Sequence, residues 1–192
     1  MVKSNTKNNI ILGSKSPRRI ELLKLMGFQF ETRKLDVDEK YPKNLSPIQI
    51  AIFLSQKKAQ AHKIKTKNIL ICADTIVYTK NQVLEKPKSK KEAIKMLKYI
   101  SNKRHFVVTG VTIKTTTTTI SFYERSIVYF KKLSKNEIEF YIENYKPFDK
   151  AGSYGIQEWI GLIGIKKISG SFYNIMGLPT MKVYEKLLDL TQ

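Results

Sequence analysis

Two kinds of hydrophobic pattern alternate along this chain. Short continuous apolar runs indicate interior strands, and apolar residues that recur every three or four positions indicate amphipathic helices. Strands are predicted at residues 9–13, 28–33, 69–73, 76–78, 83–84, 105–114, 120–130 and 162–168, and helices at residues 18–26, 46–64, 89–100, 134–143 and 179–190. Because these elements interleave without a repeat or a linker, the sequence predicts a single α/β domain over residues 1–192, built around a mixed sheet.

Local residues support the predicted helix boundaries. Ser16 and Pro17 precede the first helix and Gly27 follows it, which is the usual order of residues at helix ends. Segments 89–92 and 134–137 each place a serine three positions before a glutamate, the capping-box pattern that begins a helix. The threonine run 115–119 separates two strands, and it is predicted to form an extended turn without a functional role.

The charge balance is strongly basic. Lys and Arg number 35 against 16 Asp and Glu, a net charge of +19, and clustered cations are typical of nucleic-acid-binding proteins. Arginine, the better residue for reading bases, occurs only at positions 18, 19, 33, 104 and 125, while lysines are spread along the chain without a basic and aromatic stripe. We therefore expect a solvated surface that attracts polyanions such as nucleoside triphosphates, and no specific nucleic-acid partner, although nucleic-acid binding stays an alternative.

The composition bears on other protein classes. With 42% hydrophobic residues the chain can bury a core, and no apolar stretch approaches the roughly 18 residues of a membrane span. Without a recognisable leader or lipidation motif, we expect a cytoplasmic protein with no membrane partner. The single cysteine, Cys72, lies in an apolar run and is expected to be buried. His62 and His105 lack neighbours at metal-ligand spacing, so a zinc site is not expected, whereas a hard cation held by carboxylates and phosphates stays open.

Residues 13–19 (GSKSPRR) are the first segment with candidate chemistry. They place hydroxyls and guanidiniums on the turn between a strand and a helix N-terminus. Unpaired backbone N–H groups and the positive end of the helix dipole favour phosphate binding at such a turn, although the spacing is not that of a P-loop. The alternative is a capped helix with exposed arginines.

Asp74 is the second candidate, because it interrupts an otherwise apolar segment. A buried unpaired charge is costly, so this carboxylate is expected to be either strongly paired or catalytic. It is predicted to lie at the carboxyl end of a strand, where ligands bind in open α/β sheets. The alternative is a structural aspartate that binds local backbone.

Other candidates carry less information when taken singly. Lys86 follows a predicted strand, Lys58 lies on the long predicted helix and Glu39 lies in an acidic loop, and each alone is better explained as a solvated charge. The glycines of segment 150–157 indicate backbone that approaches a ligand or another chain segment, or else a plain tight turn.

Five segments taken in order resemble the Maf family over nearly the whole chain. They are residues 10–23 (IILGSKSPRRIELL), 73–77 (ADTIV), 84–87 (LEKP), 149–157 (DKAGSYGIQ) and 177–179 (GLP). The resemblance implies a fold similar to that of inosine-triphosphate pyrophosphatases, with an elongated mixed sheet, flanking helices and a cleft between two lobes. It also implies a nucleoside-triphosphate pyrophosphatase that requires a divalent metal, Mg²⁺ or Mn²⁺, and forms a homodimer.

The resemblance also implies roles for individual residues. Asp74 matches the family's proton acceptor, and Glu39 matches an acidic residue that, with Asp74, places the metal or the water. The residues that match positions binding the triphosphate are Ser14, Arg18, Arg19, Lys58 and Lys86. Arg18, Thr75 and Gln157 resemble the specificity residues of the branch that prefers dTTP and UTP, rather than those of the branch acting on 7-methyl-GTP. The implied substrates are therefore dTTP and UTP, with modified pyrimidine nucleotides as a further possibility.

The chain departs from the family pattern at two places. Gly13 stands where the family usually has alanine, and Glu158 with Trp159 follows Gln157, where the family usually has glycine. The second change adds bulk and charge beside a specificity residue, so it bears on base preference more than on catalysis. The functional alternative within the family is a nucleotide-binding regulator of septum formation that does not turn its ligand over.

Overall fold

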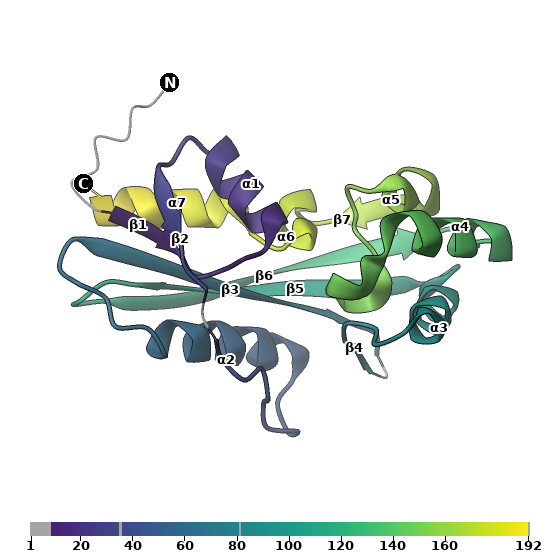
Figure 1. Cartoon of the computed structure of the whole chain (residues 1–192), viewed down its shortest axis with the longest axis horizontal. Coiled ribbons are helices and arrows are strands. Elements are labelled where there is room, and N and C mark those ends of the chain that lie inside the picture. Colours follow the sequence, from purple (N-terminus) through teal and green to yellow (C-terminus); the bar gives the residue numbers. More distant parts are fainter. Residues whose placement is uncertain (1–8, 35, 81, 192) are drawn as a thin grey trace. The chain divides into compact units, whose positions relative to one another are not determined.

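The computed structural model describes residues 9–34, 36–80 and 82–191 (Figure 1). Seven strands form one sheet in the order β2-β1-β3-β5-β6-β7, and β4 pairs with β3 outside this path. Strand β1 is parallel to β2 and β3, whereas β4 is antiparallel to β3 and β7 is antiparallel to β6. The strands are β1 (Asn9–Leu12), β2 (Phe30–Thr32), β3 (Asn68–Tyr78), β4 (Val83–Leu84), β5 (Arg104–Lys114), β6 (Thr119–Phe130) and β7 (Ile165–Ser169). The predicted mixed α/β sheet is confirmed.

Helices flank this sheet. The α-helices are α1 (Pro17–Leu25), α2 (Pro47–Gln60), α3 (Lys90–Ile100), α4 (Lys135–Tyr145), α5 (Trp159–Gly164), α6 (Phe172–Met176) and α7 (Thr180–Thr191), and two short 3-10 helices are η1 (Pro147–Asp149) and η2 (Ala151–Ser153). Among the described residues, no helix is both long and apolar enough to cross a membrane.

The chain forms two compact units. The first contains the residues up to Asp74, residues Thr109–Glu124 and the chain from Gly177 onward, and the second contains Thr75–Val108 and Arg125–Met176. The two are described separately below. A single domain and a cleft between lobes stay predictions.

The core of the first unit lies between β1, β3 and α2. Ile10 pairs with Ile69 and Leu12 with Ile71 in the parallel register. Ala59 of α2 packs against Leu70 and Cys72, and all three are buried. Figure 1 shows α2 on one face of the strands and α1 and α7 on the other. Cys72 is therefore a core residue, as predicted.

Helix α2 is held very close to strand β5. A Cβ atom on Gly110 would lie 2.4 Å from the carbonyl carbon of Ala51, so only glycine permits this approach. Ser55 and Thr112 share a hydrogen bond of 2.8 Å between their hydroxyl oxygens. Lys114 Nζ donates to the carbonyls of Ala59 and His62, each at 3.1 Å, and so satisfies the end of the helix. These contacts fix the position of α2, which carries Lys58.

The second unit has a core of aromatic side chains and packed helices. His105, Phe130 and Tyr154 are buried, and their rings lie within 5.6 Å of one another, centroid to centroid. His105 Nε2 lies 2.8 Å from the Tyr154 hydroxyl. Helix α4 packs against α3 and α5, and Ser134 begins α4 with the predicted capping box.

Several predicted boundaries are wrong. Strand β3 does not end at Ala73 but continues through Asp74 to Tyr78, because the carboxylate finds a cationic partner and does not need to leave the strand. The segment predicted as a separate strand at residues 76–78 is thus part of β3. Its predicted pairing with β4 is confirmed, as Val77 pairs with Leu84, although the turn residue Asn81 lies outside the described residues.

Two predicted helix and strand ends are also wrong. Helix α2 ends at Gln60 rather than at residue 64. Lys114 binds the carbonyl of Ala59 in the last turn of the helix. Leu162 belongs to α5 rather than to a strand, because its N–H donates to the carbonyl of Glu158 at 3.3 Å. The capping box predicted at residues 89–92 forms only in part, since the Glu92 carboxylate accepts from the N–H of Lys88 instead of Ser89.

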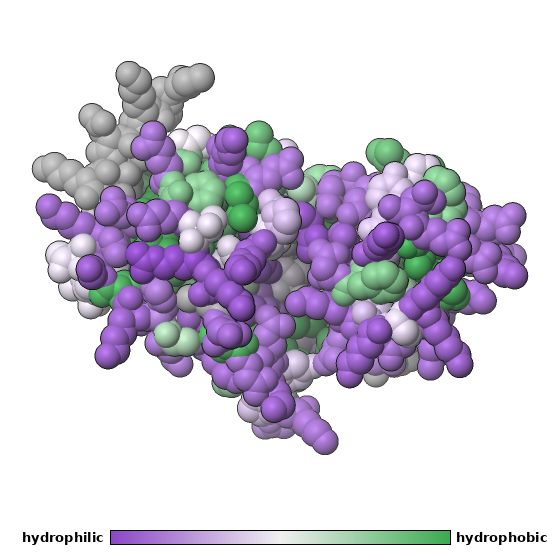
Figure 2. Space-filling view, in the orientation of Figure 1, coloured by the Kyte–Doolittle hydropathy of each residue, from purple (hydrophilic) through white to green (hydrophobic). Residues whose placement is uncertain are grey.

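The surface is predominantly hydrophilic. In Figure 2 hydrophilic side chains cover most of the face in view, and the hydrophobic ones form small separate areas. Lys24 on α1, Lys91 on α3 and Lys135 on α4 are all exposed. This spread agrees with the prediction of a solvated lysine surface.

Candidate active site

The loop after β1 places a hydroxyl beside the start of α1. The Gly13 N–H donates to the carbonyl of Ile71 at 2.8 Å, which holds the loop against β3. Ser14 Oγ accepts a hydrogen bond from the N–H of Ser16 at 3.1 Å. Pro17 begins α1, and Ser16 makes no side-chain capping bond. The expected capping bond from Ser16 is therefore absent, and the hydroxyl of Ser14, in the segment predicted to bind phosphate, bonds the backbone just before the helix.

Arg19 links this loop to a distant part of the first unit. Its Nε donates to the carbonyl of Gly177 at 2.7 Å, and its Nη1 donates to Ser14 Oγ at 3.5 Å. Burial lowers the pKa of the Arg19 guanidinium, while the charges of Asp74 and Glu39 act in the opposite direction. Gly177 has a φ of 112°, which favours glycine. The GLP segment therefore helps to hold an arginine beside two carboxylates.

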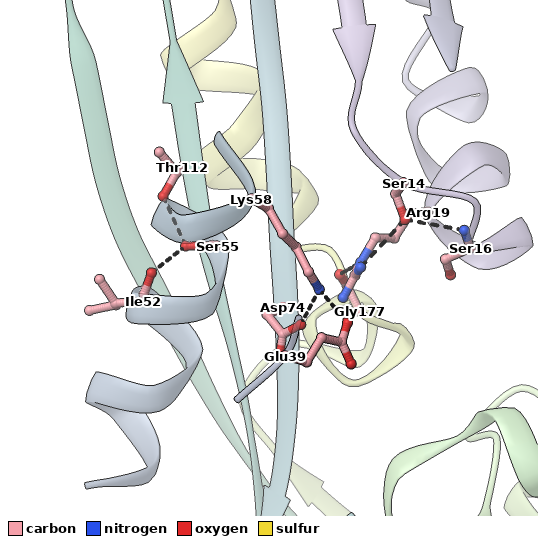
Figure 3. Close-up of polar contacts among 10 residues, drawn as sticks. All are labelled: Ser14, Ser16, Arg19, Glu39, Ile52, Ser55, Lys58, Asp74, Thr112 and Gly177. Carbon is pink, nitrogen blue, oxygen red and sulfur yellow. Dashed lines mark hydrogen bonds and ion pairs between the residues drawn. The ribbon is translucent and has the colours of Figure 1, made fainter. Parts of the chain in front are cut away.

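Asp74 faces a buried lysine. Lys58 Nζ lies 2.5 Å from Asp74 Oδ1 and 2.8 Å from Glu39 Oε1 (Figure 3). The side chains of Asp74 and Lys58 are 11% and 12% exposed, whereas that of Glu39 is 49% exposed. The two carboxylates therefore share one ammonium group. Charge-assisted contacts of this kind are strong where water is largely excluded.

The sheet register places Asp74 beyond the end of a neighbouring strand, although Asp74 lies inside its own strand. The parallel partner β1 ends at Leu12, opposite Ile71, so Asp74 lies beyond the carboxyl end of β1. The loop that carries Ser14 leaves the sheet at this end. The expected position of Asp74 at the end of its own strand is wrong, but its position beyond a parallel neighbour agrees with ligand binding at such edges.

The first unit thus brings together most of the residues predicted for the triphosphate. Figure 3 shows Ser14, Arg19, Glu39, Lys58 and Asp74 gathered in one region. Arg18 precedes Arg19 on α1 and is partly exposed. Its positive charge contributes to the lowered pKa of the Arg19 guanidinium. Arg18 therefore belongs to the same cationic region.

Two carboxylates of this region, those of Glu39 and Asp74, offer the oxygen ligands that a hard cation prefers. Glu39 and Asp74 converge on the same point in space, which Lys58 Nζ now takes. Among the residues that the structure describes, no group of three or more His, Cys, Asp or Glu side chains could hold a metal ion. The pair fits a cation of the Mg²⁺ type that takes its remaining ligands from water and substrate phosphates.

Three predicted residues belong to the second unit. Thr75 follows Asp74 in β3 and is partly buried, Lys86 follows β4 and is exposed, and Gln157 is exposed. That these side chains contact the same ligand as Asp74 stays a prediction.

The glycine-rich segment at residues 150–157 packs closely on another part of the second unit. Gly152 has a φ of 71°, and a Cβ atom there would lie 2.9 Å from Val77 Cγ1. Its N–H also donates to the carbonyl of Glu85 at 3.3 Å. Of the alternatives, close approach to another chain segment is supported.

Two groups of residues were missed by reasoning from the sequence. One is the carbonyl of Gly177, whose role depends on a contact between residues 158 positions apart. The other is a buried polar network of Tyr141, Lys150 and Glu158 in the second unit. The signal for the network was Glu158 itself, the only charged residue of the sequence between Lys150 and Lys166.

Comparison with known proteins identifies the family. The Maf-like protein family matches residues 9–190 of the sequence. The chain belongs to the Maf family. A protein of Bacteroides thetaiotaomicron named dTTP/UTP pyrophosphatase is 48% identical over 193 residues, which cover 99% of this chain and 100% of that protein. Proteins with the same name from Parabacteroides distasonis and Flavobacterium johnsoniae are 45% and 47% identical, over 97% and 99% of this chain and 98% and 100% of theirs.

Similar solved structures are more distant. A nucleoside-triphosphatase, dITP/XTP pyrophosphatase, of Mycobacterium abscessus has a TM-score of 0.39 and 13% identity, and the match covers 65% of this chain and 75% of that chain. The Ham1 protein of Staphylococcus aureus has a TM-score of 0.42 and 16% identity, covering 64% and 72% of the two chains. Neither likeness is close enough to bear on the site.

Proposed function

We propose that this chain is a nucleoside-triphosphate pyrophosphatase that hydrolyses dTTP and UTP, and related modified pyrimidine nucleotides, to the monophosphate and pyrophosphate. The observation that carries this proposal is the buried carboxylate of Asp74, which faces Lys58 and lies in the field of Arg19. The name that its relatives carry, dTTP/UTP pyrophosphatase, agrees with this chemistry.

The cationic side chains bind the triphosphate. Arg18, Arg19 and Lys58 of the first unit, with Lys86 of the second, neutralise the negative charge that builds up as the phosphoanhydride bond breaks. Ser14 and the N-terminus of α1 add hydrogen-bond donors to phosphate oxygens. In the ligand-free protein Lys58 is held by two carboxylates, so phosphate oxygens compete with those carboxylates for the ammonium.

Asp74 acts as the proton acceptor. A water molecule attacks the α-phosphorus, and the bond from this phosphorus to the bridging oxygen breaks. Pyrophosphate leaves with that oxygen, while the proton of the water passes to the Asp74 carboxylate. When phosphate draws Lys58 away, Asp74 gains a free lone pair for this proton. Glu39, the second carboxylate bound to Lys58, is 49% exposed, so its side chain can move together with the ammonium.

Glu39 and Asp74 are the residues that would hold the divalent metal, Mg²⁺ or Mn²⁺. Bound there, the metal would supply positive charge that stabilises the departing pyrophosphate. The proposal rests on the convergence of the two carboxylates on one point, at 2.5 and 2.8 Å from Lys58 Nζ.

Base recognition is assigned to Arg18, Thr75 and Gln157, as the family resemblance implies. Gln157 is an exposed residue. An amide both donates and accepts hydrogen bonds, and it therefore complements the alternating acceptors and donor on the edge of uracil or thymine. A homodimer and a cytoplasmic location stay predictions.

A pyrophosphate-release assay tests the proposal. Purified protein is given each common triphosphate and modified pyrimidine triphosphates, with Mg²⁺, with Mn²⁺ and with a chelator. We expect release from dTTP and UTP that stops in the chelator. Nucleotide binding without release from any triphosphate would instead favour the septum-formation regulator, and tight DNA or RNA binding that falls steeply with salt would favour the nucleic-acid alternative.

A further inference from the structure

Gln157 projects from a segment that is otherwise buried or partly buried. Of the residues from Gly152 to Ile160, all of which the structure describes, only Gln157 is exposed. Its neighbour Ile156 is 5% exposed and Ile160 is fully buried. The backbone on both sides of Gln157 is therefore anchored, while Gln157 itself is exposed.

Glu158, the next residue, turns its carboxylate into the second unit. Its side chain is 17% exposed, and its Oε1 lies 3.1 Å from the ammonium of Lys150, which is itself 9% exposed. Lys150 also pairs with Asp149 at 2.7 Å. A buried ammonium requires counter-charges, so Glu158 and Lys150 stabilise each other. The charge that separates this chain from the family pattern is thus part of a buried ion pair.

Tyr141 of α4 joins this ion pair to the backbone before Gln157. Its hydroxyl donates to Glu158 Oε2 and accepts the N–H of Gly155 at 2.9 Å. Tyr141 is fully buried. One hydroxyl therefore ties the backbone at Gly155 to the side chain at Glu158, and Gln157 lies between these two attachment points.

Gly155 leaves space for the Glu158 carboxylate where this network meets the backbone. A Cβ atom on Gly155 would lie 2.6 Å from Glu158 Cδ and 2.9 Å from each carboxylate oxygen. The N–H of Glu158 donates to the carbonyl of Gly155 at 3.1 Å, which closes a tight turn. The turn from Gly155 to Glu158 is therefore held by its backbone hydrogen bond and by the Glu158 carboxylate, which packs against Gly155.

Trp159 adds a second attachment to the same helix. Its ring lies 4.7 Å from that of Phe140, centroid to centroid, and Phe140 precedes Tyr141 on α4. Glu158 and Trp159 thus both fix the turn to α4, one through a polar contact and one through ring packing.

We propose that Tyr141, Glu158 and Lys150 form a positioning network that fixes the turn from Gly155 to Glu158 and so orients the Gln157 amide toward a pyrimidine base. The inference rests on the proposed function, in which Gln157 contacts the base. An amide discriminates between bases only if its oxygen and nitrogen are held in one orientation, and supporting contacts of this kind supply that order. None of the three network side chains needs to touch the nucleotide.

The test compares base selectivity across a set of variants. The selectivity is kcat/KM for dTTP divided by kcat/KM for GTP, measured by pyrophosphate release. The variants are Glu158→Ala, Glu158→Gln, Tyr141→Phe, Gln157→Ala and the double variant Glu158→Ala with Gln157→Ala. Glu143→Gln serves as a matched control, because Glu143 is an exposed α4 carboxylate that pairs with an exposed lysine, Lys90.

We expect Glu158→Ala and Tyr141→Phe to lower the selectivity about tenfold, mainly through KM for dTTP, since an oriented hydrogen bond is weakened. Glu158→Gln keeps an acceptor for the Tyr141 hydroxyl and should restore part of the selectivity. The double variant should be no less selective than Gln157→Ala alone, because the network acts through Gln157. The control should leave selectivity unchanged.

Several results would overturn the proposal. Folded Glu158→Gln and Tyr141→Phe proteins with unchanged selectivity would do so, as would equal losses for all nucleotides alongside a lower Tm. Losses that multiply in the double variant would show that Glu158 acts independently of Gln157. If the wild-type enzyme is active and any of these results is found, only the positioning role is excluded. If the wild-type protein releases no pyrophosphate from any triphosphate, the proposed function and the positioning role are both excluded.

Discussion

Lys58 Nζ lies 2.5 Å from Asp74 Oδ1, and both side chains are almost excluded from solvent. This pair joins helix α2 to strand β3 at the point where the neighbouring strand β1 has ended. It explains how a carboxylate is tolerated inside a buried strand. It also places the proposed proton acceptor beside the proposed phosphate-binding cation.

Removal of the Lys58 ammonium should weaken binding of the triphosphate. We expect Lys58→Ala to lower kcat/KM for dTTP by about tenfold to a hundredfold, since a charge-assisted hydrogen bond to phosphate is lost. The neighbouring Lys57 is a matched control, because its ammonium donates to the exposed backbone carbonyl of Lys40 and not to Asp74. Lys57→Ala should therefore stay close to wild type in the same steady-state assay. Equal effects of the two substitutions would mean that general positive charge, rather than the position of Lys58, binds the substrate.

Close packing of α2 on β5 should also control activity, because α2 carries Lys58. Gly110→Ala introduces a Cβ atom 2.4 Å from the Ala51 backbone, and we expect it to lower the free energy of unfolding by about 1–3 kcal/mol and to reduce pyrophosphate release. Urea unfolding and the release assay measure the two effects.

The clash at Gly110 involves backbone atoms, so a smaller side chain at position 51 should not relieve it. The double variant Gly110→Ala with Ala51→Gly is therefore expected to be no more stable than Gly110→Ala alone. Recovery of stability in the double variant would show that side-chain crowding, and not the approach of the helix backbone, makes glycine necessary.

His105 should make the protein sensitive to acid. Burial lowers the pKa of His105 from 6.5 to about 3, and its Nδ1 has no hydrogen-bond partner among the described residues. Between these two pH values the unfolded chain binds a proton that the native state does not. The free energy of unfolding therefore falls as the pH drops below about 6.5, by up to about 1.4 kcal/mol per pH unit from this residue.

Denaturant unfolding at pH 7, 6, 5 and 4 measures this dependence. His105→Gln is expected to give a flatter profile below pH 6.5, although its stability at pH 7 is lower. His62 serves for comparison, since it is only partly buried and its pKa is also lowered, by burial and then by Arg33 and Lys114. His62→Gln should flatten the profile less. A His105→Gln protein with the wild-type slope would contradict a buried neutral His105.

The sequence predicted the strands and helices well where the pattern was local. The buried runs of β1 and β3 and the capping box at Ser134 are examples. The prediction is wrong at Asp74, which lies inside β3 and not at the end of a strand. Its partner Lys58 lies 16 positions earlier on another element, and no local pattern shows that the charge is neutralised within the strand.

Hydrophobicity alone also could not separate α5 from β7. The apolar residues from Leu162 to Ile168 suit either structure, and the helical turn depends on hydrogen bonds from Gly161 and Leu162 to the carbonyl of Glu158. The family resemblance supplied the residue roles at the candidate site. The geometry of the first unit adds that Glu39, Lys58 and Asp74 are in direct contact.

The most direct test of the central claim, that Asp74 accepts the proton of the attacking water, is the rate of pyrophosphate release by Asp74→Asn. Asparagine keeps the size of the side chain and an oxygen that can accept from Lys58, but it cannot take up the proton. The account predicts that nucleotide binding is largely retained while kcat for dTTP falls by about a hundredfold or more. An Asp74→Asn protein that binds dTTP and releases pyrophosphate at the wild-type rate would contradict it.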